Sequence, residues 1–359
     1  MTSQPAAVTS RLLARRPENV TRRLDPDSRL CLLNGHEIIQ ALRDEQVIVL
    51  ACNTRIKHVI PGIMRAAEEL DAVVCFELSR RESDLAGGYT GLTPEDHFAA
   101  VAAYAAETGF TRPFFLHADH LTVAGADAAS LAAVRELIAA QLAAGYTSFA
   151  LDASLLPLAE NAQVCAELSQ PVRERGLGLE VQLGGAGGPL TSLAEAQEFL
   201  ARLAGLGMRP DLLAINNGAR HGHYLDGEEI DLDLERTLAI HQALRTYGVS
   251  MAQHGVSGTP LTLLGRFADH GIRKGNVGSH WQNIVYRYLP AELMGEMKKW
   301  AAATGQDLRF AAKPFKQEID HLPADMIQAI EEEARRTAHH YLKAFRAPGT
   351  GSLVIRALG

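Results

Sequence analysis

The sequence predicts an α/β fold, a (β/α)8 barrel of the TIM type with an N-terminal helical arm and a C-terminal helical extension. Eight short runs of β-branched and other apolar residues recur along the chain. Each is followed by a Gly or polar turn and, in most cases, by a segment rich in Ala, Leu and Glu with apolar residues at three- and four-residue steps, the helix period. The runs recur at roughly thirty-residue spacing and together span close to the ~250 residues typical of such barrels. Strand order cannot be read from one sequence, so a doubly wound open sheet is the alternative.

The expected elements follow one another in a regular order. We expect strands at 47–52, 72–79, 112–119, 148–152, 176–183, 211–216, 249–255 and 272–278. The clearest helices between them are expected at 62–71, 94–109, 129–145, 158–176, 192–207 and 233–248. A helix at 34–46 is expected to close one end of the barrel. Residues 290–345 are strongly helical in pattern, most clearly at 327–345, and a loose tail is expected from Pro348.

These elements divide the chain into three parts without a separate second domain. Residues 1–34 form the arm, 35–290 the barrel, and 291–359 an extension that packs on the barrel or on a partner subunit. The first 24 residues contain five Arg and one acidic residue, which superficially resembles a transit peptide, but they lack an apolar core of the secretory type. An irregular or helical arm is the favoured interpretation.

Composition excludes several classes of protein. Hydrophobic residues make up 47% of the chain and charged residues 21%, as in a soluble globular protein with a large core. No apolar run is long enough to cross a membrane. The net charge of −7 gives no general attraction for nucleic acid or anionic membranes. The four cysteines stand apart from one another, which favours reduced thiols and a cytoplasmic location.

Titratable residues occur at the ends of three predicted strands. Asp119 and His120 end the third strand within FLHADHL (115–121), His221 follows the sixth, and His254 ends the seventh. Because barrel enzymes build their active sites at the C-terminal ends of the strands, these residues are expected to converge. Three neutral imidazoles from separate strands are the ligand set of a catalytic zinc with one open position. The alternative is that these histidines only satisfy loop backbones, and the role of His117 stays open.

Glycine-rich loops follow the last three predicted strands. Such loops can present backbone N–H groups and a Ser hydroxyl to an anion, and barrels often hold phosphate near strands seven and eight. Ordinary turn chemistry is the alternative interpretation. The residues concerned are Gly222, Gly255, Ser257, Gly278 and Ser279.

Five motifs in order, HADH, LEVQLGGAGG, NGARHGHY, HGVSG and IRKGNVGSHWQ, resemble class II, metal-dependent fructose-bisphosphate and tagatose-bisphosphate aldolases. The resemblance covers roughly residues 35 to 290. It implies a homodimer or larger homo-oligomer and one zinc ion held by His120, His221 and His254. It also implies that Asp119 is the catalytic acid/base and that Asn276 contacts the reacting ketose.

The same resemblance implies a sugar-phosphate substrate and a place in carbohydrate metabolism such as glycolysis. Gly222, Gly255, Ser257, Gly278 and Ser279 match the phosphate loops, and Asn53 and Ser79 match early-strand positions that face the substrate. A monovalent cation, Na⁺ or K⁺, is expected near the loops. The implied reaction is reversible cleavage of a ketose (bis)phosphate to dihydroxyacetone phosphate, or a similar donor, and an aldehyde. Zinc stabilises the enediolate as a Lewis acid while Asp119 carries the C4 hydroxyl proton.

Several positions depart from the family pattern. Pro189 and Leu190 stand where acidic residues are common, Gln182 replaces a Glu, Leu225 replaces a Lys, and His280-Trp281 replaces a Thr/Ser-Asp-like stretch. The residues that could supply substitute positive charge are Arg55, Lys57, Arg220, Lys274, Lys313 and Lys316. Two alternatives remain open, a zinc-dependent hydrolase on the same barrel and a non-catalytic barrel that binds sugar phosphate.

Overall fold

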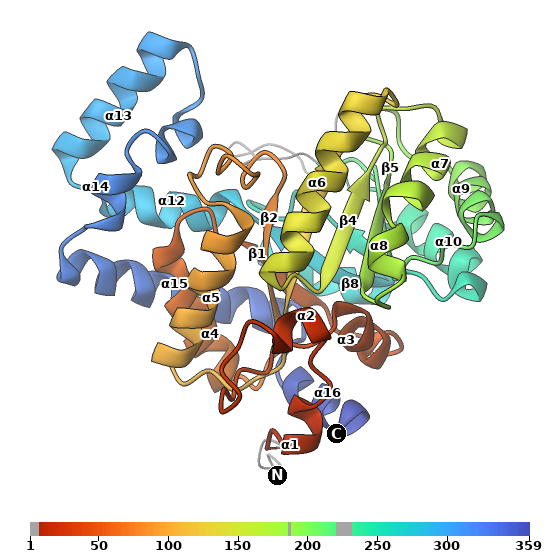
Figure 1. The fold of residues 1–359 in the computed structure, drawn as a ribbon, viewed down its shortest axis with the longest axis horizontal. Helices are drawn as coiled ribbons and strands as arrows, with labels where there is room; N and C mark the ends of the chain where they lie inside the picture. The colour runs from red at the N-terminus through yellow and green to blue at the C-terminus, as the bar shows by residue number, and fades with distance from the viewer. Residues whose placement is uncertain (1–6, 186–187, 220–231) are drawn as a thin grey trace.

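A computed structural model describes residues 7–185, 188–219 and 232–359. Within these residues, eight parallel strands pair in chain order and close into a barrel, β1 to β8, with helices around it (Figure 1). The predicted (β/α)8 barrel is therefore confirmed, and the open sheet is excluded by the pairing of β1 with β8. The strands are β1 Val49–Asn53, β2 Val74–Ser79, β3 Phe114–Thr122, β4 Ser148–Asp152, β5 Gly178–Leu183, β6 Leu212–Ile215, β7 Ser250–Gln253 and β8 Ile272–Val277.

The outer helices agree with the predicted segments to within a few residues. Leu, Ile, Val and Ala side chains on their inner faces are buried against the strands, as the helix period requires. The predicted helix at 158–176 is divided into two by Ser169. The helices are α4 Ile60–Glu69, α5 Pro94–Glu107, α6 Ala128–Ala144, α7 Leu158–Leu168, α8 Gln170–Arg173, α9 Leu193–Gly205, α10 Leu234–Leu244, α11 Leu261–Phe267 and α12 Ser279–Tyr288.

Strand β3 does not end where the sequence suggested. It continues past Asp119 and His120 to Thr122, so that prediction is wrong. Its register against β4 shifts between Ala118 and Leu121, and His120 has φ +39°, a conformation that a side chain other than Gly rarely adopts. A β-bulge of this kind re-aims a side chain without ending the strand. The irregularity therefore sets the direction of His120.

The N-terminal end of the barrel is closed by α3 Gly35–Leu42, as predicted. Asn34 caps this helix by accepting a hydrogen bond from the His36 N–H at 3.0 Å. A side chain at Gly35 would lie 2.6 Å from the Cβ of Ser148, so only glycine allows this close approach to the barrel floor. Ile38 and Ile39 are buried in a cluster separate from the main core.

The predicted loose tail after Pro348 is wrong, because residues Thr350–Leu358 form helix α16, which packs against α3. Val354 and Ile355 are buried. The hydroxyl of Thr350 accepts a hydrogen bond from the Val73 N–H at 2.9 Å. Helix α1, Ser10–Leu13, lies on the same side of the barrel, beside α16 (Figure 1).

The segments after α12 form helices on the same side of the barrel as α4 and α5 (Figure 1). They are α13 Ala291–Thr304, the 3-10 helix η4 Leu308–Ala312, α14 Lys316–Asp320 and α15 Ala324–Ala344. Helix α15 packs on α4 so closely that a side chain at Gly62 would lie 2.1 Å from the Glu331 carbonyl oxygen. The boundaries of arm, barrel and extension stay predictions, as does contact of the extension with a partner subunit.

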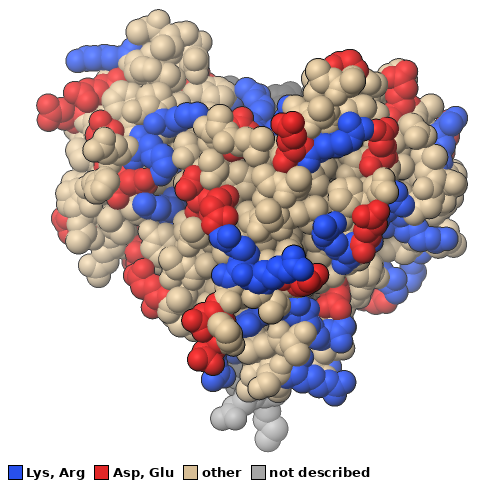
Figure 2. Space-filling view, viewed as in Figure 1, with Lys and Arg blue, Asp and Glu red and all other residues tan. Residues whose placement is uncertain are grey.

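The surface carries both signs of charge. On the face shown in Figure 2, acidic and basic side chains are interspersed among uncharged ones. Among the described residues, we find no helix with the length and apolarity that a membrane span requires.

Candidate active site

A cavity of about 470 Å³ opens at the C-terminal ends of the strands. Ten of the twelve predicted site residues line it, although they come from both halves of the chain. His221 and Gly222 lie outside the described residues, as do Arg220 and Leu225. The ten are Asn53, Ser79, Asp119, His120, His254, Gly255, Ser257, Asn276, Gly278 and Ser279.

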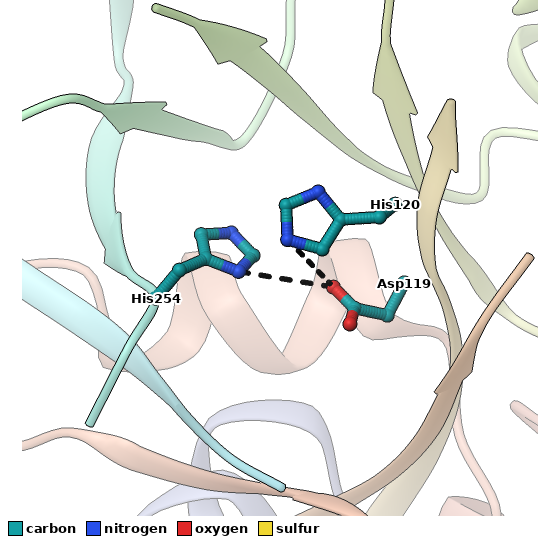
Figure 3. A group of neighbouring side chains, drawn as sticks. All are labelled: Asp119, His120 and His254. Carbon is teal, nitrogen blue, oxygen red and sulfur yellow. Dashed lines mark ion pairs between the residues drawn. The ribbon is translucent and has the colours of Figure 1, made fainter. Parts of the chain in front are cut away.

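At the base of the cavity, two histidines face one carboxylate. The Nε2 atom of His120 lies 4.0 Å from Asp119 Oδ1, and the Nδ1 atom of His254 lies 3.9 Å from the same oxygen (Figure 3). One potential ligand atom from each of the three residues lies within 4.8 Å of the others. This grouping fits two of the three predicted metal ligands, with the predicted acid/base beside them.

A second carboxylate orients each of these histidines. The Nδ1 atom of His120 lies 3.3 Å from Asp152 Oδ2, and the Nε2 atom of His254 lies 2.8 Å from Glu180 Oε1. A ring nitrogen that donates to a carboxylate leaves the other nitrogen as a lone-pair donor, which is how metal-binding histidines are usually held. In both rings the remaining nitrogen faces Asp119, so the residues present fit a divalent metal ion.

Electrostatics in the site favour negative charge on Asp119. Burial alone would raise its pKa, but the nearby His120, His254 and Lys274 outweigh burial and hold the pKa below the usual range. Burial would likewise lower the pKa of His120, but Asp119 and Asp152 raise it to about 10. The pKa of His254 is lowered by burial and by the charge of His120. The carboxylate thus stabilises a positive charge at the position where a metal ion would bind.

Two asparagines hold Asp119 in place. Asn53 Nδ2 donates to Oδ2 at 3.0 Å, and Asn276 Nδ2 donates to Oδ1 at 3.1 Å. Asn53 comes from β1 and Asn276 from β8, the strand pair that closes the barrel. The closed topology therefore brings the first and last strands to the same carboxylate.

The predicted phosphate loops form one wall of the cavity. The hydroxyl of Ser257 accepts hydrogen bonds from the N–H groups of Gly278 and His280 at 3.1 and 3.4 Å. A Cβ atom at Gly278 would lie 2.8 Å from Arg55 Nη2, so the guanidinium approaches the loop backbone closely at this glycine. Arg55 also donates to the Ser279 hydroxyl at 3.4 Å and pairs with Glu82 at 2.6 Å.

Among the residues suggested as substitute positive charge, only Arg55 lines this cavity within the described part of the chain. Lys274 is fully buried inside the barrel. Lys57 pairs with Asp320 at 3.3 Å, Lys313 donates to the Ala86 carbonyl, and Lys316 pairs with Asp320.

Sequence reasoning missed another part of the cavity wall. Arg81, from the loop after β2, and Arg309, from η4, lie 5.5 and 5.2 Å from the centre of the Phe310 ring. Phe310 packs edge-on against Tyr89, with ring centres 4.8 Å apart. Neither loop carries a motif that distinguishes these arginines from ordinary surface residues, so no sequence signal could have found them.

The positions that depart from the family pattern lie in different surroundings. Gln182 lines the cavity and donates to the Gly184 carbonyl at 2.7 Å. The Nδ1 atom of His280 lies 2.8 Å from the Tyr341 hydroxyl. His117 is fully buried, and its ring nitrogens lie 2.8 Å from Ser148 Oγ and 3.5 Å from Glu180 Oε2. Glu180 contacts both His117 and His254, so His117 lies behind His254, and it is not among the residues that line the cavity.

Comparison with known proteins agrees with this geometry. The family model described as fructose-bisphosphate aldolase class-II matches residues 33–350. The chain belongs to this family. Membership makes the protein an aldolase, which is a lyase, in a family that is generally metal-dependent and acts on sugar phosphates.

Relatives of this class II aldolase include the fructose-bisphosphate aldolase of Streptococcus pneumoniae serotype 4, 27% identical over 256 residues, which cover 70% of this chain and 80% of the relative. The fructose-bisphosphate aldolase of Streptococcus pyogenes serotype M6 is 26% identical over 258 residues, 70% of this chain and 80% of the relative. Two solved structures share the fold with a TM-score of 0.64 and cover 89% of this chain. They are the YdjI aldolase from Escherichia coli K12, 19% identical with 98% of its chain covered, and a fructose-bisphosphate aldolase from Campylobacter jejuni, 17% identical with 97% covered.

Proposed function

We propose that this class II aldolase is zinc-dependent and cleaves a phosphorylated or otherwise anionic ketose reversibly to dihydroxyacetone phosphate, or a similar donor, and an aldehyde. The observation that carries the proposal is the pair of histidines, each oriented by a carboxylate at one ring nitrogen, whose other ring nitrogens face Asp119. His120, His254 and the undescribed His221 are the proposed ligands. Imidazole nitrogens at a site with an open position suit zinc.

A metal ion held by these histidines would supply Lewis-acid stabilisation of the negative charge that develops on the ketone oxygen. Asp119 is the proposed base that takes the C4 hydroxyl proton during cleavage and returns it during condensation. Its low pKa keeps it ionised at neutral pH, and Asn53 and Asn276 fix both of its oxygens. General acid–base catalysis requires such a group within hydrogen-bond reach of the transferred proton.

The donor phosphate is proposed to bind at the wall formed by Ser257, Gly278 and Ser279, together with Gly255 and the undescribed Gly222. Arg55 reaches this wall and supplies a guanidinium for an anion. It thereby offers the positive charge that Leu225 cannot provide. Asn53 and Ser79 also line the cavity and are proposed to contact the substrate.

The decisive experiment is condensation. Zinc-loaded protein is incubated with dihydroxyacetone phosphate and a panel of aldehydes with neutral, carboxylate and phosphate ends, and any ketose formed is identified. We expect a condensation product and exchange of a donor proton with solvent. Absence of both with every donor, including unphosphorylated dihydroxyacetone, would contradict the proposal. The monovalent cation, the homo-oligomer and the cytoplasmic location stay predictions.

A further inference from the structure

The fully buried Lys274 lies directly behind the proposed site, and nothing in the reaction proposed above uses it. Its Nζ atom lies 3.0 Å from each of three oxygens, Glu77 Oε2, Glu180 Oε2 and Asn276 Oδ1. The two carboxylates are also almost completely buried. An ammonium group has three donors and no acceptor, so these three contacts account for all of its hydrogen-bonding capacity.

We infer that Lys274 is a positioning residue that sets the orientation of both Asn276 and His254 at once. This inference rests on the proposed roles of those two residues. Lys274 touches neither the cavity nor a proposed metal ligand directly, so it acts through its neighbours.

Its effect on Asn276 follows from donor and acceptor chemistry. Lys274 can only donate, and the ionised Asp119 can only accept. The amide between them must therefore direct Oδ1 to Lys274 and Nδ2 to Asp119, as the two distances of 3.0 and 3.1 Å require. Without Lys274 only Asp119 distinguishes the two ends of the amide, and the buried Oδ1 of Asn276 loses its hydrogen-bond donor, so the amide is held by one contact in place of two.

Its effect on His254 runs through Glu180. One oxygen of Glu180 accepts from Lys274, and the other lies 2.8 Å from His254 Nε2. With the carboxylate acting as an acceptor, Nε2 of His254 carries the proton and Nδ1 keeps the lone pair that faces Asp119 and the proposed metal position. The same lysine thus prepares a metal ligand and a substrate contact that lie on different strands.

The test compares Lys274→Met with Glu77→Gln as the matched control. Glu77→Gln keeps an oxygen acceptor for Lys274 and leaves its contacts with Glu180 and Asn276 intact, so it should retain metal affinity within about twofold. Lys274→Met should weaken zinc binding to the metal-free protein by roughly 10- to 100-fold, the usual effect of removing an outer-shell partner. Equal affinities for Lys274→Met and the wild type would overturn the inference.

Two further measurements keep the test decisive if Lys274→Met folds poorly. In metal-free wild-type protein labelled with ¹⁵N-histidine, nuclear magnetic resonance should show His254 protonated at Nε2, and protonation at Nδ1 would overturn the inference. Glu180→Gln should populate both tautomers and should also weaken zinc binding. None of these readouts depends on turnover. A protein with the expected tautomer and metal affinity but no condensation activity would refute the proposed function and leave the positioning role standing.

Discussion

Asn276 Nδ2 donates a 3.1 Å hydrogen bond to Asp119 Oδ1 across 157 positions of sequence. Asn53 Nδ2 donates to the other carboxylate oxygen at 3.0 Å, so both oxygens of Asp119 are held by amides from β1 and β8. A carboxylate fixed in this way needs no reorganisation before it accepts a proton, which is the condition for efficient general base catalysis.

Asp119→Ala is predicted to retain zinc and lose most of its turnover. The proposed metal ligands are histidines, whereas the variant removes the proposed proton carrier, so kcat for cleavage should fall by roughly 10²- to 10⁴-fold. Mass spectrometry measures the retained zinc, and steady-state cleavage rates measure the loss of turnover. Asp269→Ala, which removes a surface ion pair with Arg346, is the matched control and should leave both unchanged. Near-normal turnover of Asp119→Ala would exclude the proposed role.

Arg81→Ala and Arg309→Ala are predicted to raise KM for ketoses with an anionic distal end and to leave kcat nearly unchanged. Both guanidinium groups lie at the cavity wall around Phe310, and Arg81 makes no ion pair or side-chain hydrogen bond with the described part of the chain. A charge-assisted hydrogen bond contributes about 1.5–3 kcal/mol, which corresponds to roughly a 10- to 100-fold change in KM.

Two controls accompany this pair of variants, one a substrate without distal charge and the other a surface variant of the protein. A ketose with a neutral distal end should show the same KM with Arg81→Ala, Arg309→Ala and the wild type. Arg335→Ala, which removes a surface ion pair with Glu69, should leave KM for every substrate unchanged. An equal rise in KM for the neutral and anionic ketoses would show that these arginines do not recognise the charge at the distal end of the substrate.

The barrel and the base of the site were predictable because the relevant signals are local. Apolar runs followed by helix-period segments indicate strands and helices, and parallel barrel strands bring their C-terminal ends together whatever their distance in sequence. Asp119, His254 and Asn276 could therefore be expected to meet. The contacts that orient them could not, because Asp152, Glu180 and Lys274 resemble ordinary strand residues until the barrel closes.

Two errors have a common physical origin in tertiary context. Gly349 and Gly351 around Thr350 suggested a loose tail, yet burial of Val354 and Ile355 against α3 stabilises a helix there. The extension of β3 past His120 likewise depends on pairing with β4, since Thr122 pairs with Asp152 beyond the bulge. Neither packing partner is adjacent in sequence, so the local pattern alone misleads.

Acid destabilisation should depend on His97, which is distant from the proposed metal ligands in sequence. Its ring nitrogens lie 3.0 Å from the Thr54 hydroxyl and 2.8 Å from the Tyr146 hydroxyl. Burial lowers the pKa of His97 to about 4 in the folded protein, whereas a histidine in the unfolded chain has a pKa of about 6.5. Below pH 6.5 the unfolded state therefore binds the proton first, and stability falls as the pH drops toward 4.

The magnitude follows from the difference between the two pKa values. Each pH unit between them removes up to about 1.4 kcal/mol, so the loss at pH 4 is roughly 3 kcal/mol. His97→Gln should lower stability at pH 7 but flatten the slope of unfolding free energy against pH in this window. Urea denaturation at several pH values measures that slope. His321→Gln, at an exposed histidine, should leave the slope as in the wild type, and an unchanged slope in His97→Gln would refute the assignment.

Removal of the metal ion is predicted to lower thermal stability and abolish turnover together. In the metal-free protein, His120 is protonated because Asp119 and Asp152 raise its pKa to about 10, so metal binding at neutral pH must displace a proton. Zinc at a thousandfold excess over its Kd adds about 4 kcal/mol to the folded state. Calorimetry should therefore show a lower Tm after chelation, and stoichiometric zinc should restore the Tm. Titration of zinc in buffers of different ionisation enthalpy measures the proton release.

The variant His254→Ala should lose the zinc-dependent rise in Tm, whereas His36→Ala, at a half-exposed residue at the opposite end of the barrel, should keep it. A Tm that does not respond to chelation, in protein shown to have lost its metal, would contradict binding at this site.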